Sequence, residues 1–183
     1  MDDDAESAEQ AGSALLWDLD NVAPGLSNLP GLAAGLSRLV GPGAVRVAAG
    51  HGRLTRACRT TLEDAGIRVL SGGRRANGAD RVLLAEAERG SRSGVGRFVV
   101  ASNDRAFARI AALGHLYVVT LDARWVSARL SEVASGVFVI ARDGSSASVL
   151  VAPARRPHPA STRHAVRRQA RVSRSSPTWR CGT

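Results

Sequence analysis

The sequence predicts an α/β fold in which a doubly wound, mostly parallel sheet of about five to six strands is covered by helices. Short apolar runs alternate along the chain with longer amphipathic stretches, and Gly, Pro or Asn residues separate the two kinds of segment. Strands that alternate with helices at this spacing are typical of parallel sheets. With 183 residues, of which 44% are hydrophobic, the chain is long enough for one domain with a sizeable core.

The expected strands are the short apolar runs. They cover residues 14–19, 45–49, 67–70, 98–101, 116–121 and 137–141, the last as an edge strand. The expected helices lie between the strands, at residues 29–40, 54–65, 79–89, 104–113 and 124–134. Asn28 and Pro30 favour the start of the first helix, and Gly66 stands where a glycine after a helix is expected.

Charge divides the chain into three parts. Residues 1–11 are acidic and small, and they are predicted to be disordered. Residues 12–143 form the predicted domain, and together with the first eleven they hold 17 Arg and 16 acidic residues. Residues 144–183 hold eight Arg and no acidic residue, so they carry almost all of the net charge of +9. This segment is predicted to be a disordered basic tail, which either binds phosphate backbones or only keeps the chain in solution.

Composition argues against a membrane or secreted protein. No apolar run approaches the ~18 residues that a membrane span needs, and the acidic start of the chain is unlike a secretory signal. Cys58 and Cys181 have neither metal-ligand spacing nor the pattern of a disulfide framework. We therefore expect a cytoplasmic protein in a reducing compartment.

Acidic residues follow three predicted strands. Asp18 and Asp20 come at the end of the first strand, Asp80 lies at the start of the third helix, and Asp104 follows the fourth strand. If the first and fourth strands are neighbours, these carboxylates meet in one crevice at the carboxyl edge of the sheet. They would repel each other and raise their own pKa values unless a divalent cation neutralised them. Oxygen ligands alone select a hard ion, so Mg²⁺ or Mn²⁺ is expected, and such an ion can activate water for attack on a phosphodiester.

Each of these acids also has a simpler interpretation. Asp20 could cap a turn, Asp80 could stabilise a helix N-terminus, and Asp104 could be an ordinary first-turn acid. Glu86, on the same predicted helix as Asp80, is either a solvated residue or a contact of the site. Acids that follow three strands at the same edge favour the shared site over three separate local roles.

Arginines in predicted loops at the same edge could contact a phosphate backbone. Arg53 follows the second strand, and Arg74 and Arg75 precede Asp80. They are candidates for nucleic-acid binding, and ordinary surface arginine is an equally good interpretation. We expect Trp125 to serve in packing, and His51, a lone loop histidine, to have no catalytic role.

Three short motifs resemble the signatures of the NYN domain. They are WDLDN at 17–21, Gly-Ala-Asp at 78–80 opening a helix, and Ser-Asn-Asp at 102–104 followed by Phe107. The resemblance spans roughly residues 13–141 with the motifs in the right order. NYN domains belong to the PIN-like nuclease group, so the resemblance implies a Rossmann-like, three-layer α/β/α fold and a Mg²⁺-dependent ribonuclease acting on single-stranded or structured RNA.

The resemblance also implies roles for individual residues. Asp18, Asp80 and Asp104 would be the catalytic, metal-holding acids, and Asp20 would be a further metal contact. Ser102 would be an additional contact of the site, and Asn21 and Asn103 would support it as polar neighbours. One position departs from the family pattern: many members carry a second acid two residues after the position of Asp104, where this chain has Ala106. Its loss would weaken a second metal site or lower activity.

Two other functions fit parts of the pattern. A catalytically weak or inactive NYN domain that binds RNA or acts as a scaffold is compatible with Ala106 and with the basic tail. A haloacid-dehalogenase-type phosphatase also has Asp-x-Asp after a strand, as in Asp18 and Asp20, but that family uses a lysine beside the site and this chain has none. Small-residue helix faces could pack in a homodimer as readily as in a core, so the oligomeric state stays open.

Overall fold

The computed structural model describes residues 12–23 and 25–150. Its centre is a seven-stranded sheet in the order β3-β2-β1-β4-β5-β6-β7. The strands are β1 (Gly12–Asp18), β2 (Val45–Gly50), β3 (Arg68–Ser71), β4 (Val95–Ala101), β5 (His115–Thr120), β6 (Gly136–Ile140) and β7 (Ala147–Leu150). β1 to β6 pair in parallel, and β7 joins β6 antiparallel at the edge. The predicted α/β class with a mostly parallel sheet is confirmed.

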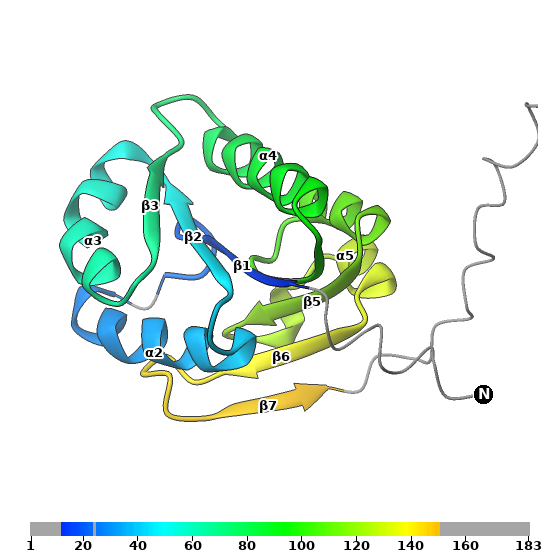
Figure 1. Ribbon diagram of the computed structural model, residues 1–183. Helices are drawn as coiled ribbons and strands as arrows, with labels where there is room; N and C mark the ends of the chain where they lie inside the picture. Colours follow the sequence, from blue (N-terminus) through cyan, green and yellow to red (C-terminus); the bar gives the residue numbers. More distant parts are fainter. Residues whose placement is uncertain (1–11, 24, 151–183) are drawn as a thin grey trace, which may run out of the picture.

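Helices cover both faces of the sheet, which makes a three-layer, Rossmann-like arrangement (Figure 1). The α-helices are α2 (Leu29–Val40), α3 (Gly52–Asp64), α4 (Gly78–Arg92) and α5 (Ala128–Val133). Three 3₁₀ helices complete the described chain: η1 (Leu26–Asn28), η2 (Arg105–Ala112) and η3 (Ala123–Trp125). None of the helices in the described part of the chain is long and apolar enough to cross a membrane.

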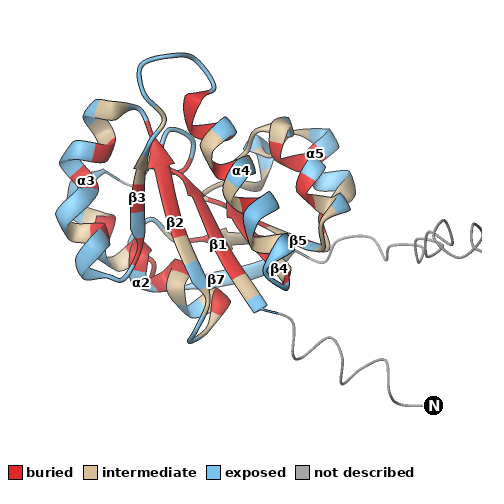
Figure 2. Ribbon diagram, turned by 45° about the horizontal axis from the view of Figure 1, so that its top comes forward, coloured by how far each residue is buried: buried red, intermediate tan, exposed pale blue. Residues whose placement is uncertain are grey.

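The side chains of β1 show how the two core layers form. Leu15 and Trp17 point to one face, where they pack with residues of α2 and α3. Ala14 and Leu16 point to the other face, where they pack with residues of α4, η2 and α5. This alternation follows from the two-residue period of a strand. Because both faces are covered, the central strands are buried along most of their length (Figure 2).

The Trp17 side chain fixes the turn that follows β1. Its ring is fully buried, and its Nε1–H donates to the carbonyl of Val22 at 2.8 Å. The backbone N–H of Leu19 continues the pairing with β2 by donating to the Ala49 carbonyl at 2.8 Å. The first acidic turn is therefore anchored to the core on both sides.

Three details of the predicted fold are corrected. Residues 137–141 were expected to form an edge strand, but β6 is an inner strand because β7 pairs with it. β7 and the turn before it lie in the segment predicted to be a disordered tail, so the ordered domain continues beyond residue 143 to at least residue 150. The segment after β4 is the 3₁₀ helix η2 and not an α-helix. The predicted disorder of residues 1–11 and 151–183 concerns segments outside the described residues.

Candidate functional site

The acidic residues meet where the strand order reverses. The chain runs from β1 through β2 to β3 on one side, and then places β4 on the other side of β1. At the carboxyl edge of such a sheet, the loops after β1 and β4 diverge and leave a crevice, which is where ligands bind in open α/β sheets. A cavity of about 240 Å³ lies here, lined by the side chains of Asp18, Asp20, Asp80 and Asp104 among others. The convergence predicted from the sequence is confirmed.

Asp18, the last residue of β1, is the most deeply buried of these acids, with 1% of its surface exposed. Its Oδ2 accepts hydrogen bonds from Asn21 Nδ2 at 2.6 Å and from Ser102 Oγ at 2.9 Å, and its Oδ1 accepts one from the Asp20 backbone N–H at 3.1 Å. Burial raises the pKa of Asp18, whereas these three hydrogen bonds act in the opposite direction. Asn21 and Ser102 are therefore both in direct contact with the Asp18 carboxylate.

Asp20 is exposed and turns toward the start of α3. Both of its carboxylate oxygens accept from the His51 backbone N–H, at 3.0 Å each. His51 is the residue that caps α3, and its Nδ1 accepts from the Arg53 backbone N–H at 3.3 Å. No catalytic role was predicted for His51, and its contact with Asp20 is made by its backbone, which fixes the orientation of the Asp20 carboxylate.

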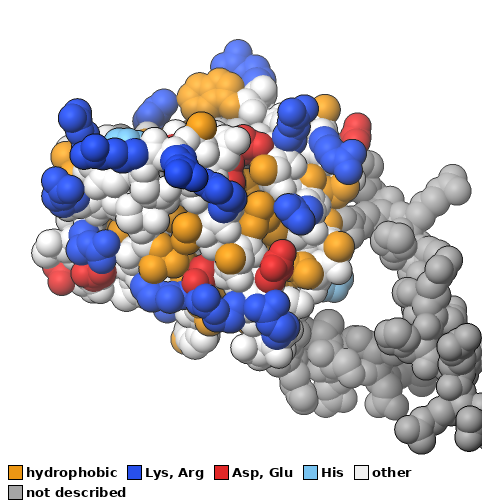
Figure 3. Space-filling view, turned by 90° about the horizontal axis from the view of Figure 1, so that it is seen from above, with side chains coloured by type: hydrophobic (Ala, Val, Ile, Leu, Met, Phe, Trp, Pro, Cys, Tyr) orange, Lys and Arg blue, Asp and Glu red, His pale blue; other side chains and the backbone are white. Residues whose placement is uncertain are grey.

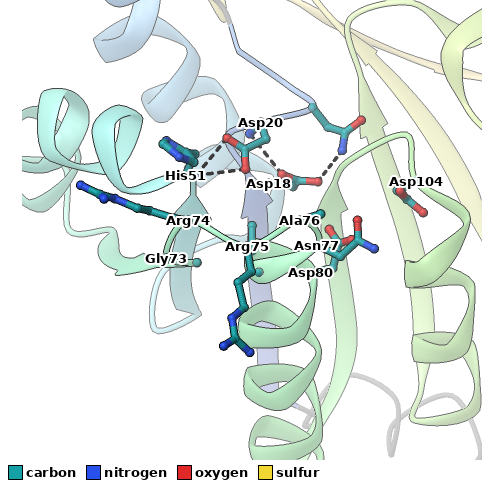
Figure 4. A pocket seen from close by; sticks show the side chains of 14 residues that line it. Asp18, Asp20, His51, Gly73, Arg74, Arg75, Ala76, Asn77, Asp80 and Asp104 are labelled. Atoms are coloured by element: carbon teal, nitrogen blue, oxygen red, sulfur yellow. Dashed lines mark hydrogen bonds between the residues drawn. The ribbon is translucent and has the colours of Figure 1, made fainter.

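Asp80 lies in the first turn of α4 and is 8% exposed. Within the described part of the chain, no hydrogen bond reaches its carboxylate. Burial is the main cause that raises the pKa of Asp80 to about 6, and the charges of Asp18, Asp104 and Asp20 contribute after it, in that order of importance. The four carboxylates therefore form one electrostatic unit, with Asp80 as its least compensated member. Figure 4 shows Asp18 and Asp80 between Asp20 and Asp104 around the same opening.

Asp104 caps η2 at the opposite wall of the cavity. Its Oδ1 accepts from the Ala106 backbone N–H at 2.7 Å, and its own N–H donates to Ser102 Oγ at 3.2 Å. Because the same hydroxyl donates to Asp18, Ser102 links the loops after β1 and β4. Asn103 faces elsewhere: its Oδ1 accepts from Thr120 Oγ1 at 2.7 Å, which ties the loop to the end of β5. Asn103 thus supports the loop, and its side chain does not line the cavity.

The donor set fits a divalent cation by its chemistry. All four side chains offer carboxylate oxygens, which suit Mg²⁺ and Mn²⁺, and Asp80 has an uncompensated charge to neutralise. In the described residues, however, no three acidic, His or Cys side chains converge closely enough to hold an ion as they stand. Asp20 is turned to His51 and Asp104 to Ala106 by the hydrogen bonds given above. Holding a cation with three carboxylates would require at least one of these side chains to exchange its backbone donor for the ion.

The loop between β3 and α4 closes tightly against the start of α4. A Cβ on Gly78 would lie 1.9 Å from the Gly72 carbonyl oxygen, and a Cβ on Gly72 would lie 2.4 Å from the Ala79 nitrogen. The loop is also joined to β2, because the Gly72 N–H donates to the Gly50 carbonyl at 2.9 Å. Only glycine allows this close approach, which brings Asp80 to the cavity.

The predicted arginines lie on this loop and on α3, with different orientations. Arg74 extends past His51, and Arg75 points along α4 away from the carboxylates (Figure 4). Arg53 does not line the acidic cavity; it lines a neighbouring groove together with His51, Arg56 and Arg74. Arg56 was not predicted, although the spacing of Arg53, Arg56 and Arg59 along one helix was a signal that could have found it.

Two other expectations are wrong. Glu86 does not contact the site: it forms ion pairs with Arg68 and Arg89, at 2.5 Å each, and does not line the cavity. Trp125 was expected to be a packing residue, but half of its surface (50%) is exposed on η3, just beyond the carboxyl end of β5.

Comparison with known proteins adds no assignment, since no family model and no curated protein matches the chain. The resemblance to the NYN domain therefore stays a prediction that rests on the three short motifs.

Proposed function

We propose that this protein is a metal-dependent ribonuclease of the NYN type, which hydrolyses RNA phosphodiester bonds at the crevice between β1 and β4. The observation that carries the proposal is the buried Asp80 carboxylate. It accepts no hydrogen bond in the described part of the chain, its pKa is raised to about 6, and three further carboxylates face the same cavity. Such an arrangement is costly in stability, and a bound cation would offset that cost.

In this proposal Asp18, Asp80 and Asp104 hold Mg²⁺ or Mn²⁺, with Asp20 as a further contact. When bound, the ion supplies a Lewis acid for a phosphate oxygen and a water of lowered pKa. Ser102 and Asn21 act on Asp18: their hydrogen bonds favour its charged form and fix the direction of its carboxylate. The closed glycine loop holds Asp80 opposite Asp18.

A cleavage assay tests the proposal. Purified full-length protein is incubated with labelled single-stranded RNA in Mg²⁺, in Mn²⁺ and in EDTA, beside Asp18→Asn and Asp80→Asn. We expect cleavage with either metal and none in EDTA, and a loss of at least about 100-fold in both variants, because each removes a charge needed to hold the ion. Asp64→Asn is the matched control, since Asp64 is exposed on α3 outside the cavity, and it should cleave like the wild type.

Cleavage that persists in EDTA or in Asp80→Asn would contradict the proposal. Binding of RNA without cleavage by the wild type would favour a second function, an inactive NYN domain that binds RNA. Two observations favour that alternative: Ala106 stands where many family members have an acid, and the carboxylates of the described chain are not already arranged around an ion.

The phosphatase alternative finds little support in the geometry. That family uses a lysine beside the site, and this chain has none; no arginine is hydrogen-bonded to Asp18 in the described residues, where its carboxylate accepts from Asn21, Ser102 and the Asp20 backbone. A phosphoenzyme is therefore not expected, and trapping one on Asp18 would reverse this conclusion.

A further inference from the structure

A groove next to the acidic cavity is lined by arginines. It lies between the first turns of α3 and the loop between β3 and α4, where Arg53, Arg56 and Arg74 line a cavity of about 650 Å³. A second cavity of about 350 Å³ continues it along α3 and shares Arg56 and Arg74. Figure 3, which is seen from above relative to Figure 1, shows several Arg side chains on the left, the side on which α3 lies in Figure 1, and others spread over the same face.

The three arginines at the centre of this groove have no acidic partner among the described residues. By contrast, Arg59, which lines the second cavity, forms an ion pair with Glu63, and Arg124 on η3 forms one with Asp122. Arg53, Arg56 and Arg74 form no ion pair with any described residue, and all three are exposed. Unpaired guanidinium groups that face a common groove are typical of sites for phosphate groups, which they bind through paired hydrogen bonds.

The groove is continuous with the acidic cavity. His51 and Arg74 line both cavities. The 13-residue helix α3 begins at Gly52, which lines the groove, so the positive end of this helix faces the groove. A phosphate bound in the groove would therefore lie beside the carboxylates. It would not lie among them, since an anion there would face four negative charges.

We propose that this groove, defined by Arg53, Arg56 and Arg74, is a subsite for the backbone phosphates of a single-stranded polynucleotide whose neighbouring phosphodiester lies at the acidic cavity. The inference rests on the proposed function and makes it more specific. A ligand with one phosphate cannot occupy cavity and groove together, whereas a chain with phosphates on successive nucleotides can. The substrate is thus a polynucleotide strand of several nucleotides, and small phosphodiesters gain nothing from the groove.

Equilibrium binding tests the subsite without catalysis. Full-length wild type and the double variant Arg53→Ala/Arg56→Ala are titrated, in EDTA, against a fluorescent single-stranded RNA of about 12 nucleotides, a length typical of single-strand sites. We expect about tenfold weaker binding in the variant at physiological salt, and a salt slope smaller by about 0.7 for each phosphate that the variant no longer neutralises. Arg92→Ala/Arg109→Ala is the control, because it removes the same charge from exposed positions outside the groove.

A second arm compares substrates. The groove variant should lose about tenfold in kcat/KM for the RNA and nothing for a p-nitrophenyl ester of a mononucleotide, which carries a single phosphodiester. The inference is overturned if the groove variant binds RNA like the wild type, if the control loses as much affinity, or if both substrates lose equally. The two proposals fail separately. If the wild type binds RNA through the groove but never cleaves it, the nuclease proposal is contradicted and the subsite proposal stands. If RNA is cleaved and the groove variant behaves like the wild type, the subsite proposal is contradicted and the nuclease proposal stands.

Discussion

At the scale of single residues, the Asp80 carboxylate is the least compensated charge of the acidic cavity. Ordinary surface acids gain stability from a nearby cation or hydrogen bond, but Asp80 has neither in the described residues, and its pKa is raised to about 6 from 3.8 by burial and by three neighbouring acids. A carboxyl group whose pKa is higher in the folded than in the unfolded state favours folding when it is protonated and opposes folding when it is ionised. The stability that protonated Asp80 contributes is therefore fully present below about pH 4 and is lost as the pH rises through about 6.

Asp80→Asn should therefore stabilise the metal-free protein. One pKa unit corresponds to about 1.4 kcal/mol, so we expect the free energy of unfolding at pH 7–8 to rise by about 1–3 kcal/mol, with little gain at pH 4. Urea unfolding of both proteins in EDTA across this pH range measures the difference. Asp64→Asn, an exposed control, should change stability by less than about 0.5 kcal/mol at any pH. Equal stability of Asp80→Asn and wild type at pH 8 would mean that the carboxylates do not repel each other.

The residues at the ends of strands could be placed correctly at the edge of the sheet from the sequence. Asp18 and Asp104 follow apolar runs that had to be strands, and parallel strands deliver their carboxyl ends to one edge. The contact predicted between Glu86 and the site is absent because of helix geometry. Glu86 lies six residues after Asp80, which is about 120° away around the helix, while Leu83 and Ala87 share the face of Asp80 and are buried.

At the scale of elements, the loop between β3 and α4 determines where Asp80 lies. Gly78 and Gly72 touch through their backbones, so any side chain at Gly78 must push the start of α4 away from β3. The sequence indicated a glycine-rich loop here, but not which glycines meet, because that contact depends on the distance between two backbones and not on residue type.

Gly78→Ala, compared with a second Gly→Ala change in α4, should distinguish the close contact between Gly78 and Gly72 from a change in helix propensity. We expect it to lower the free energy of unfolding by about 1–3 kcal/mol, as overpacking does, and to reduce cleavage by displacing Asp80. Gly90→Ala, in the same helix, is the control: its Cβ would lie 3.4 Å or more from its nearest neighbours, so it should be neutral or stabilise by up to about 1 kcal/mol. Thermal unfolding and cleavage rates of both variants give the answer, and similar behaviour of the two would refute the role of the loop.

The elements that were misjudged are the weakly patterned ones. β7 is an edge strand in a short segment, residues 144–150, that holds three serines and no charged residue, and its Val149 is exposed. Its antiparallel pairing with β6 makes it a strand, although its sequence pattern does not predict one. The segment after β4 has the spacing of an amphipathic helix, and that spacing did not distinguish an α-helix from the 3₁₀ helix η2, which begins at the Asp104 cap.

At the scale of the whole molecule, the strand order creates the site. The sequence predicted alternating strands and helices, but the adjacency of β1 and β4 had to be assumed from the commonest doubly wound order. The structure confirms that order. It also reveals a division of charge along one edge, with arginines beyond β2 and β3 and carboxylates between β1 and β4. The sequence placed arginines and acids at the same edge but did not show that they lie apart along it, because that separation depends on the order of the strands and on the direction of the side chains.

If the four carboxylates form a single cation site, as proposed, the protein binds Mn²⁺ there, and calorimetric titration measures that binding. Experiments at pH 6 and pH 8, each in two buffers of different ionisation enthalpy, measure both affinity and protons released. At pH 6 Asp80 is about half protonated, so binding should release no less than about half a proton, and at pH 8 clearly less. Asp80→Asn should bind far more weakly and release fewer protons. A wild type that binds no Mn²⁺, or an Asp80→Asn variant that binds it equally well, would contradict the account.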